Sequence, residues 1–501
     1  MIENVKISII ASFASRFSAA ILSIIVVPIY IKILGIESYG IIGFFTTLQA
    51  LATLFDFGIG TTIIKEFSSK NDKKSHQKLS DLAKASEFVY IIIACFIFLV
   101  LYTSIPWIVN SWINIGDLSK TSVTESLLIA SLALSIQWPA TLYASGLAGL
   151  HKQLQLASYN TGILFLRVIS IVIVLKFVSP TIKYFFIVNL IFSLIQFIVM
   201  RHLMWSNLPK PNNWGKSKDR LIELKGFIGT MSAISVCSVL LTQLDKIILS
   251  NILTLKDFGV YSLVVVFSGG LYLAVSPIFS VIYPRLSSIV SSGSPIDVID
   301  FYHKSCQLLS MILIPIAVIV SFFSEKILFV WTGDITLSSI AKWPLILLVI
   351  GNALNGMMNA PYALQLAYSK PKLALYSNVI SILFLIPSIY YLAKNYGVIG
   401  GAFAWLVINI LYVLASQYIT HRHLLKSDLF KWYWTDVGLP LLACALNVYA
   451  LYLLTPNNLT RLELLLYLTF VFFESLVIVI LLLPEMRRMA LTSLMFSKLG
   501  R

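Results

Sequence analysis

A series of long apolar windows constrains this chain more than any other feature of its sequence. One crossing of a bilayer takes about 20 residues of helix. Backbone groups in lipid must bond within their own segment, so helices are expected for runs of this length. The chain has 501 residues, and only 12% of them are charged, which is too few to cover a soluble protein. The windows are 8–33, 40–63, 85–104, 123–149, 155–177, 182–204, 226–250, 258–281, 305–328, 339–367, 373–393, 398–420, 437–455 and 462–483.

Basic residues are distributed unequally between the two predicted sides of the membrane. An even number of spans, here fourteen, puts both termini on one side, and the connections on that side carry 25 Lys and Arg residues against 9 on the other. The positive-inside rule therefore places both termini in the cytoplasm. The net charge of +15 follows from this bias in topology, and we expect no nucleic-acid partner.

An internal repeat is visible at an offset of 219 residues. The segment 33–41 (ILGIESYGI) aligns with 252–260 (ILTLKDFGV), and both lie in the outer link between the first two helices of a half. Six spans separate them, so the halves have the same orientation, as in one of the common transporter designs. The sequence predicts an all-α polytopic membrane protein with about 14 helices. We expect a lobe at 1–204, a basic linker at 205–225, a second six-helix lobe at 226–420, and two further helices with a basic tail at 421–501.

Three cations fall inside predicted spans at successive depths: Arg16, Arg167 and Lys246. A charge within a span is costly and usually faces a water-filled interior. Arginine binds phosphate through paired hydrogen bonds, so we expect these residues to line a route for an anion. The structural alternative is ion pairing, for example between Arg16 and Asp56. Glu474, in the last window, lies outside the duplicated part and is expected to pack against a neighbour or to line a peripheral groove rather than to contact substrate.

Polar side chains form stripes at helical spacing within several spans. Such stripes either join helices by hydrogen bonds or line a cavity, and we favour cavity lining for the acidic and Asn stripes. Asp56 or Asp245 could also hold a coupling H⁺ or Na⁺, although Lys246 beside Asp245 offers simple neutralisation. The stripes are Thr46–Gln49–Thr53–Asp56, Ser235–Ser238–Thr242–Asp245, Asn352–Asn355–Asn359 and Gln137–Thr141–Ser145.

Signals for catalysis are missing from the sequence. No nucleophile–base arrangement or cluster of metal-ligating spacing is present, and Gly215-Lys216-Ser217 lacks the earlier glycine and strand of a P-loop. We expect no cofactor, no metal and no enzymatic activity.

Four short motifs carry a family resemblance. They are Leu34-Gly35 to Tyr39-Gly40, Asp56-Phe57-Gly58, Gln243-Leu244-Asp245-Lys246, and Phe258-Gly259-Val260-Tyr261. With fourteen spans arranged as six, six and two, the chain resembles the bacterial polysaccharide transporters. These are the O-antigen (Wzx-type) flippases of the multidrug/oligosaccharidyl-lipid/polysaccharide exporter superfamily.

The resemblance implies translocation of undecaprenyl-pyrophosphate-linked oligosaccharide repeat units across the bacterial inner membrane by alternating access. It implies a cationic central cavity, and it places Arg16, Asp56, Arg167, Asp245 and Lys246 on the wall. Expected partners are membrane lipid, a polysaccharide polymerase and a chain-length regulator, with the chain itself a monomer. Two alternatives stay open: an ion-coupled multidrug or cation antiporter of the same fold, and a membrane enzyme of polysaccharide assembly. The enzyme is less favoured, because the outer connections are short and no His lies in mid-span.

Overall fold

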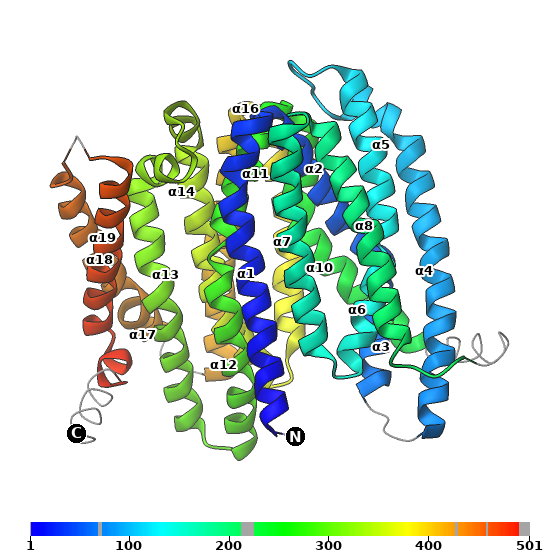
Figure 1. Cartoon of the computed structure of the whole chain (residues 1–501). Helices are drawn as coiled ribbons and strands as arrows, with labels where there is room; N and C mark the ends of the chain where they lie inside the picture. The colour runs from blue at the N-terminus through cyan, green and yellow to red at the C-terminus, as the bar shows by residue number, and fades with distance from the viewer. Residues whose placement is uncertain (1, 69–72, 212–224, 426–428, 457–458, 490–501) are drawn as a thin grey trace, which may run out of the picture. The chain divides into compact units, whose positions relative to one another are not determined.

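The computed structural model describes residues 2–68, 73–211, 225–425, 429–456 and 459–489, and these are almost entirely helical (Figure 1). The extended contact in the described ranges is one isolated bridge between Asn114 and Thr254. All fourteen predicted windows lie on helical segments. Twelve segments of the described chain are long and apolar enough to span a membrane. Two predicted windows share one of them, α16, and the window 226–250 lies on α10, outside the twelve. The prediction of a helical polytopic membrane protein is confirmed.

The chain divides into two compact units, residues 1–259 and 260–501. The predicted linker at 205–225 falls largely on residues 212–224, which are outside the described part. The helices of the first unit are α1 (Ile2–Leu34), α2 (Ile36–Ala52), η1 (Thr53–Asp56), α3 (Ile59–Ser68), α4 (Lys73–Trp107), η2 (Ile108–Trp112), α5 (Lys120–Gln137), α6 (Ala140–Gly149), α7 (Gln153–Phe177), α8 (Ile182–Trp205) and α10 (Lys225–Ile252), with the start of α11 (Leu255–Gly269).

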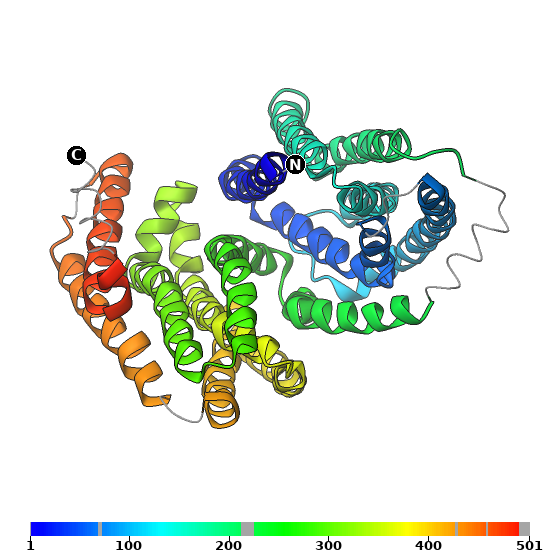
Figure 2. The same cartoon turned by 90° about the horizontal axis from the view of Figure 1, so that it is seen from below.

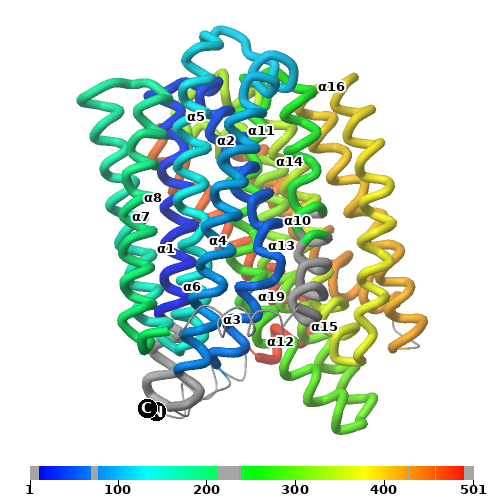
Figure 3. Tube along the Cα trace, turned by 90° about the vertical axis from the view of Figure 1, so that its right-hand side faces the viewer, coloured from blue at the N-terminus to red at the C-terminus, as the bar shows by residue number. Residues whose placement is uncertain are grey.

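Two predicted spans of the first unit are each interrupted. After the 3₁₀ turn η1, Phe57 and Gly58 both adopt left-handed backbone angles (φ 47° and 70°), which ends the helix before α3 begins. Pro139, which has no N–H to donate, separates α5 from α6. The two short helices that follow the breaks, α3 and α6, pack side by side (Figures 1 and 3).

The second unit contains the rest of α11 and then α12 (Tyr272–Ser292), α13 (Pro295–Thr332), α14 (Ile335–Met357), α15 (Asn359–Ala367), α16 (Pro371–Thr420), η3 (His421–Leu425), α17 (Leu429–Lys431), η4 (Trp432–Gly438), α18 (Leu439–Leu453) and α19 (Arg461–Leu482). The long helix α16 is two helices joined at Gly397, whose φ of 57° and ψ of −135° are not helical. η3 and η4 are π-helices.

The interruptions of the first unit recur in the second. A break between Gly269 and Tyr272 separates α11 from α12, and Met358 separates α14 from α15. The short helix after the second break, α15, packs against α12, just as α6 packs against α3. The same order of continuous and broken helices therefore supports the internal duplication. The exact lobe boundaries remain a prediction.

The two helices beyond the duplicated part pack against α13. Figure 2 shows α18 and α19, at the orange and red end of the colour scale, lying together at one side of the second unit. Asn447 of α18 donates a hydrogen bond to Glu474 of α19, which confirms that Glu474 packs against a neighbour. Arg461, at the start of α19, donates to the carbonyl oxygens of Val330 and Trp331 at 2.7 and 3.0 Å. The last hairpin is thereby fixed to the end of α13.

Candidate functional site

A chain of side-chain hydrogen bonds crosses four helices of the first unit and ends on Arg167. Gln49 of α2 donates to Gln137 of α5 at 3.3 Å, and the Gln137 amide donates to Gln196 Oε1 of α8 at 3.3 Å. Arg167 of α7 donates through Nη2 to the same Gln196 oxygen at 2.7 Å. The structure thus brings three predicted residues, Gln49, Gln137 and Arg167, into one network.

The Arg167 guanidinium has no carboxylate as an ion-pair partner among the residues that the structure describes. The ion pairs found in the described residues do not include Arg167, and its strongest described contact is the neutral amide of Gln196. Its Nε–H is buried and has no hydrogen-bond partner. A half-buried guanidinium with an unused donor is suited to binding the oxygens of an anion.

Asp56 is held by neighbours in its own unit. Its carboxylate accepts a hydrogen bond from the Tyr90 hydroxyl of α4 and another from the Gly60 amide at 3.3 Å. The alternative of an Arg16–Asp56 ion pair finds no support, since the ion pairs of the described chain do not join them. Arg16 is exposed on α1, next to Ser15, which bonds α7 through the Ala157 carbonyl oxygen.

The stripe on α10 lies on a helix that packs against α2, η1 and α3. Lys246 is half-buried and donates to Gln243 of its own helix at 3.0 Å. Asp245 is half-buried and has partners of its own, and Thr242 is exposed. The side chains of Ser235 and Ser238 lie outside the described residues. The structure therefore brings the helices of the two acidic stripes together.

The Asn stripe lies in the second unit and joins helices. Asn352 is buried and accepts a hydrogen bond from the Trp405 indole of α16 at 2.9 Å. Asn355 donates to Asn409 of α16 and accepts from Tyr272 of α12, both at 2.9 Å. Asn359 donates to the backbone carbonyl oxygens of Gly356 and Asn355, one turn earlier in the chain, at 3.0 and 3.4 Å. Asn352 and Asn355 thus show the interhelical bonding that was the alternative reading of this stripe, whereas their role in lining a cavity stays a prediction.

Some members of these networks were missed in the sequence. Gln196 and Tyr90 carry no charge and belong to no stripe, so no signal marked them. Glu87 is 8% exposed and accepts hydrogen bonds from Tyr143 at 2.7 Å and Arg201 at 2.6 Å. A carboxylate inside the window 85–104 was a signal that could have identified Glu87 as a buried group.

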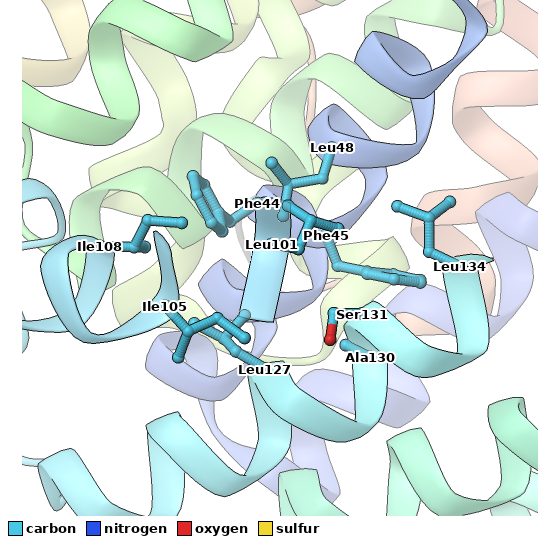
Figure 4. A pocket seen from close by; sticks show the side chains of 10 residues that line it. All are labelled: Phe44, Phe45, Leu48, Leu101, Ile105, Ile108, Leu127, Ala130, Ser131 and Leu134. Carbon is cyan, nitrogen blue, oxygen red and sulfur yellow. The ribbon is translucent and has the colours of Figure 1, made fainter. Parts of the chain in front are cut away.

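One pocket lies between α2, α4 with η2, and α5, and its lining is apolar (Figure 4). The one polar side chain in that lining, Ser131, already donates to the Leu128 carbonyl oxygen at 2.8 Å. This pocket offers nothing to a sugar or a phosphate. In the described part of the chain, no group of three or more His, Cys, Asp or Glu side chains is placed to hold a metal ion. The lining residues are Phe44, Phe45, Leu48, Leu101, Ile105, Ile108, Leu127, Ala130, Ser131 and Leu134.

Residues 5–290 match a family described as polysaccharide biosynthesis protein. The chain belongs to this family. A curated relative, a putative O-antigen transporter of Shigella flexneri, is 23% identical over 439 residues, which cover 81% of this chain and 96% of the relative.

Solved structures share the fold of this polysaccharide biosynthesis protein. Lipid II flippase MurJ in an inward closed conformation superposes with a TM-score of 0.71 at 17% identity, covering 99% of this chain and all of MurJ. A multidrug resistance MATE family transporter of the MOP superfamily, in an inward-facing conformation, gives a TM-score of 0.62 at 12% identity. That match covers 79% of this chain and 94% of the transporter. The proteins named in these comparisons are transporters and flippases rather than enzymes.

Proposed function

We propose that this polysaccharide biosynthesis protein is a flippase for lipid-linked oligosaccharides. It moves undecaprenyl-pyrophosphate-linked repeat units, of O-antigen or a similar surface polysaccharide, from the cytoplasmic to the periplasmic leaflet of the bacterial inner membrane. It works as a monomer by alternating access, with both termini in the cytoplasm. Its partners are membrane lipid, a polysaccharide polymerase and a chain-length regulator. Family membership and the likeness to MurJ support the proposal.

The observation that carries the proposal is that the three cations within predicted spans have no carboxylate as an ion-pair partner in the described part of the chain. Arg167 and Lys246 are bonded to neutral amides, and Arg16 is exposed. The ion pairs of the described residues include none of the three. Uncompensated charge inside a membrane protein is costly, so it is retained where a ligand of opposite charge completes it. A pyrophosphate carries that charge, while its prenyl tail stays in the lipid.

The test is deletion of the gene in its host, followed by extraction of lipid-linked sugars and staining of surface polysaccharide. Undecaprenyl-pyrophosphate repeat units should accumulate on the cytoplasmic side, and surface polymer should be lost. Complementation with Arg16→Gln, Arg167→Gln or Lys246→Gln should fail at normal membrane abundance. Lys176→Gln, which removes an exposed cation from the same helix as Arg167, should restore the polymer. Full complementation by the three cation variants would contradict the anion route.

The second candidate is an ion-coupled multidrug or cation antiporter, favoured by the shared fold with the MATE transporter and by Asp56 and Asp245. It predicts normal surface polymer in the deletion strain and new sensitivity to cationic drugs. Coupling to H⁺ or Na⁺ is tested separately with Asp56→Asn and Asp245→Asn. If either carboxylate binds the coupling ion, transport by that variant loses its dependence on the ion gradient.

A further inference from the structure

Gln196 of α8 is the side chain that accepts a hydrogen bond from the Arg167 guanidinium. Its Oε1 accepts two hydrogen bonds, from Arg167 Nη2 at 2.7 Å and from the Gln137 amide at 3.3 Å. The amide therefore uses its carbonyl oxygen to hold the guanidinium on α7 from the neighbouring helix α8. Charged side chains within membrane spans commonly pair with a side chain of opposite charge or with backbone carbonyl oxygens. The partner of Arg167 is instead Gln196, whose side chain has the length of a glutamate and the same acceptor atom, Oε1, but no charge.

The chain of amides explains why the Gln196 oxygen faces Arg167. Gln137 accepts from Gln49 through Oε1, so its own amide nitrogen is directed at Gln196. Two donors, one from Gln137 and one from Arg167, then converge on a single oxygen. An anionic ligand can therefore replace Gln196 as the acceptor for Arg167. After Arg167 has turned to the ligand, the Gln196 oxygen still accepts a hydrogen bond from Gln137 and is not left unsatisfied.

We infer that Gln196 is a positioning residue that holds Arg167 in place while leaving its positive charge available to a phosphate or pyrophosphate group. This inference rests on the proposed function. It differs from a purely structural role in one respect. A structural role requires only an acceptor on residue 196, whereas a charge-setting role requires that the acceptor be neutral. Glu and Leu at this position separate the two, since Glu keeps the acceptor and adds charge, and Leu removes the acceptor and adds none.

The experiment measures binding of farnesyl pyrophosphate, a short-chain polyprenyl pyrophosphate, to the purified full-length chain in detergent at low salt. Gln196→Leu should weaken binding by about tenfold, through loss of positioning. Gln196→Glu should weaken it by about 100-fold, because a carboxylate takes the place of the ligand on Arg167. Arg167→Gln should lose binding to the same degree. Gln155→Glu is the matched control, since it adds the same charge to an exposed position of α7; it should bind like the parent.

The relative affinities of Gln196→Leu and Gln196→Glu for farnesyl pyrophosphate decide whether the inference holds. If Gln196→Glu binds as tightly as Gln196→Leu or more tightly, Gln196 is a structural residue and the inference is wrong. If Arg167→Gln binds like the parent, the anion site of the proposed function itself is wrong. Thermal unfolding of each variant checks that it is folded. If Gln196→Glu does not fold, the pair Gln196→Asp and Gln196→Asn takes its place, because the two side chains have the same size and differ in charge. Gln196→Asp should bind about tenfold more weakly than Gln196→Asn. Equal affinity of these two variants would contradict the inference.

Discussion

His303 of α13 bonds Asp436 of η4 through its Nδ1 atom, and both side chains are almost completely buried. Gln307, one turn further along α13, donates to the other Asp436 oxygen at 2.8 Å and accepts from the backbone amide of Glu485 at 2.9 Å. Asp436 precedes α18, and Glu485 follows α19. One buried cluster thus fastens both chain ends of the last helical hairpin to α13.

Removing Asp436 should destabilise the second unit strongly. Asp436→Ala leaves His303 and Gln307 buried without their acceptor, and we expect a cost of about 3–5 kcal/mol. Denaturation of the detergent-solubilised chain measures it. Asp300→Asn is the control, because Asp300 bonds Lys304 at 2.6 Å in an exposed ion pair, which is worth less than about 1 kcal/mol. If Asp436→Ala and Asp300→Asn lowered the free energy of unfolding equally, the buried cluster would not be what holds the last hairpin to α13.

Gly149 and Gly162 should respond differently to the same substitution. A Cβ on Gly149 would lie 2.6 Å from the Phe67 Cβ and 3.1 Å from the Ile64 backbone, so α6 would be pushed away from α3. A Cβ on Gly162 meets nothing within 4 Å. Gly149→Ala should therefore lower stability by about 1–3 kcal/mol, whereas Gly162→Ala should leave it unchanged or raise it slightly. Unfolding midpoints of the two variants give the comparison, and a stable Gly149→Ala would refute the close packing of α3 on α6.

Tyr90 and Asp56 should show coupled effects on stability. Tyr90→Phe removes the hydroxyl donor and leaves the Asp56 carboxylate with the Gly60 amide at 3.3 Å, at a cost of about 1–3 kcal/mol. Asp56→Asn replaces the charged acceptor with a neutral one. The double variant should cost less than the sum of the two single variants, by about 1 kcal/mol, because the shared hydrogen bond is lost only once. Strictly additive free energies of unfolding would mean that the two groups do not interact.

Asn355 and Asn359 separate the two interpretations of the Asn stripe. Asn355→Leu loses hydrogen bonds to Asn409 and Tyr272, each worth about 0.6–1.7 kcal/mol between membrane helices. Among the described residues, Asn359 bonds only two backbone oxygens of its own helical turn, so Asn359→Leu should cost little stability. If Asn359 lines the transport route, surface polymer should fall in that variant at normal abundance. A loss of stability in Asn359→Leu equal to that in Asn355→Leu would remove the distinction.

The helices were predictable because lipid leaves the backbone no alternative. Every predicted apolar window lies on helical segments. The interruptions within windows, such as those at Gly58 and Pro139, were not predicted and became visible only in the structure. The duplication was visible in two aligned segments, one containing Gly40 and the other Gly259. The structure explains why both positions are glycine. The backbones of α2 and α11 approach closely there, and a Cβ on either glycine would lie 2.2 Å from a carbonyl oxygen of the other helix. The family resemblance followed from the same short motifs.

The sequence by itself determined which charges fall within the predicted apolar spans, because charge and hydropathy are local properties of the chain. It identified Arg16, Arg167 and Lys246 for this reason. Only the tertiary structure decided the partners of those charges. Asp56 pairs with Tyr90 rather than Arg16, and Arg167 is held by Gln196, 29 residues away on another helix. A hydrogen bond between helices depends on their rotation and relative height, and these are fixed by the packing of all their neighbours together.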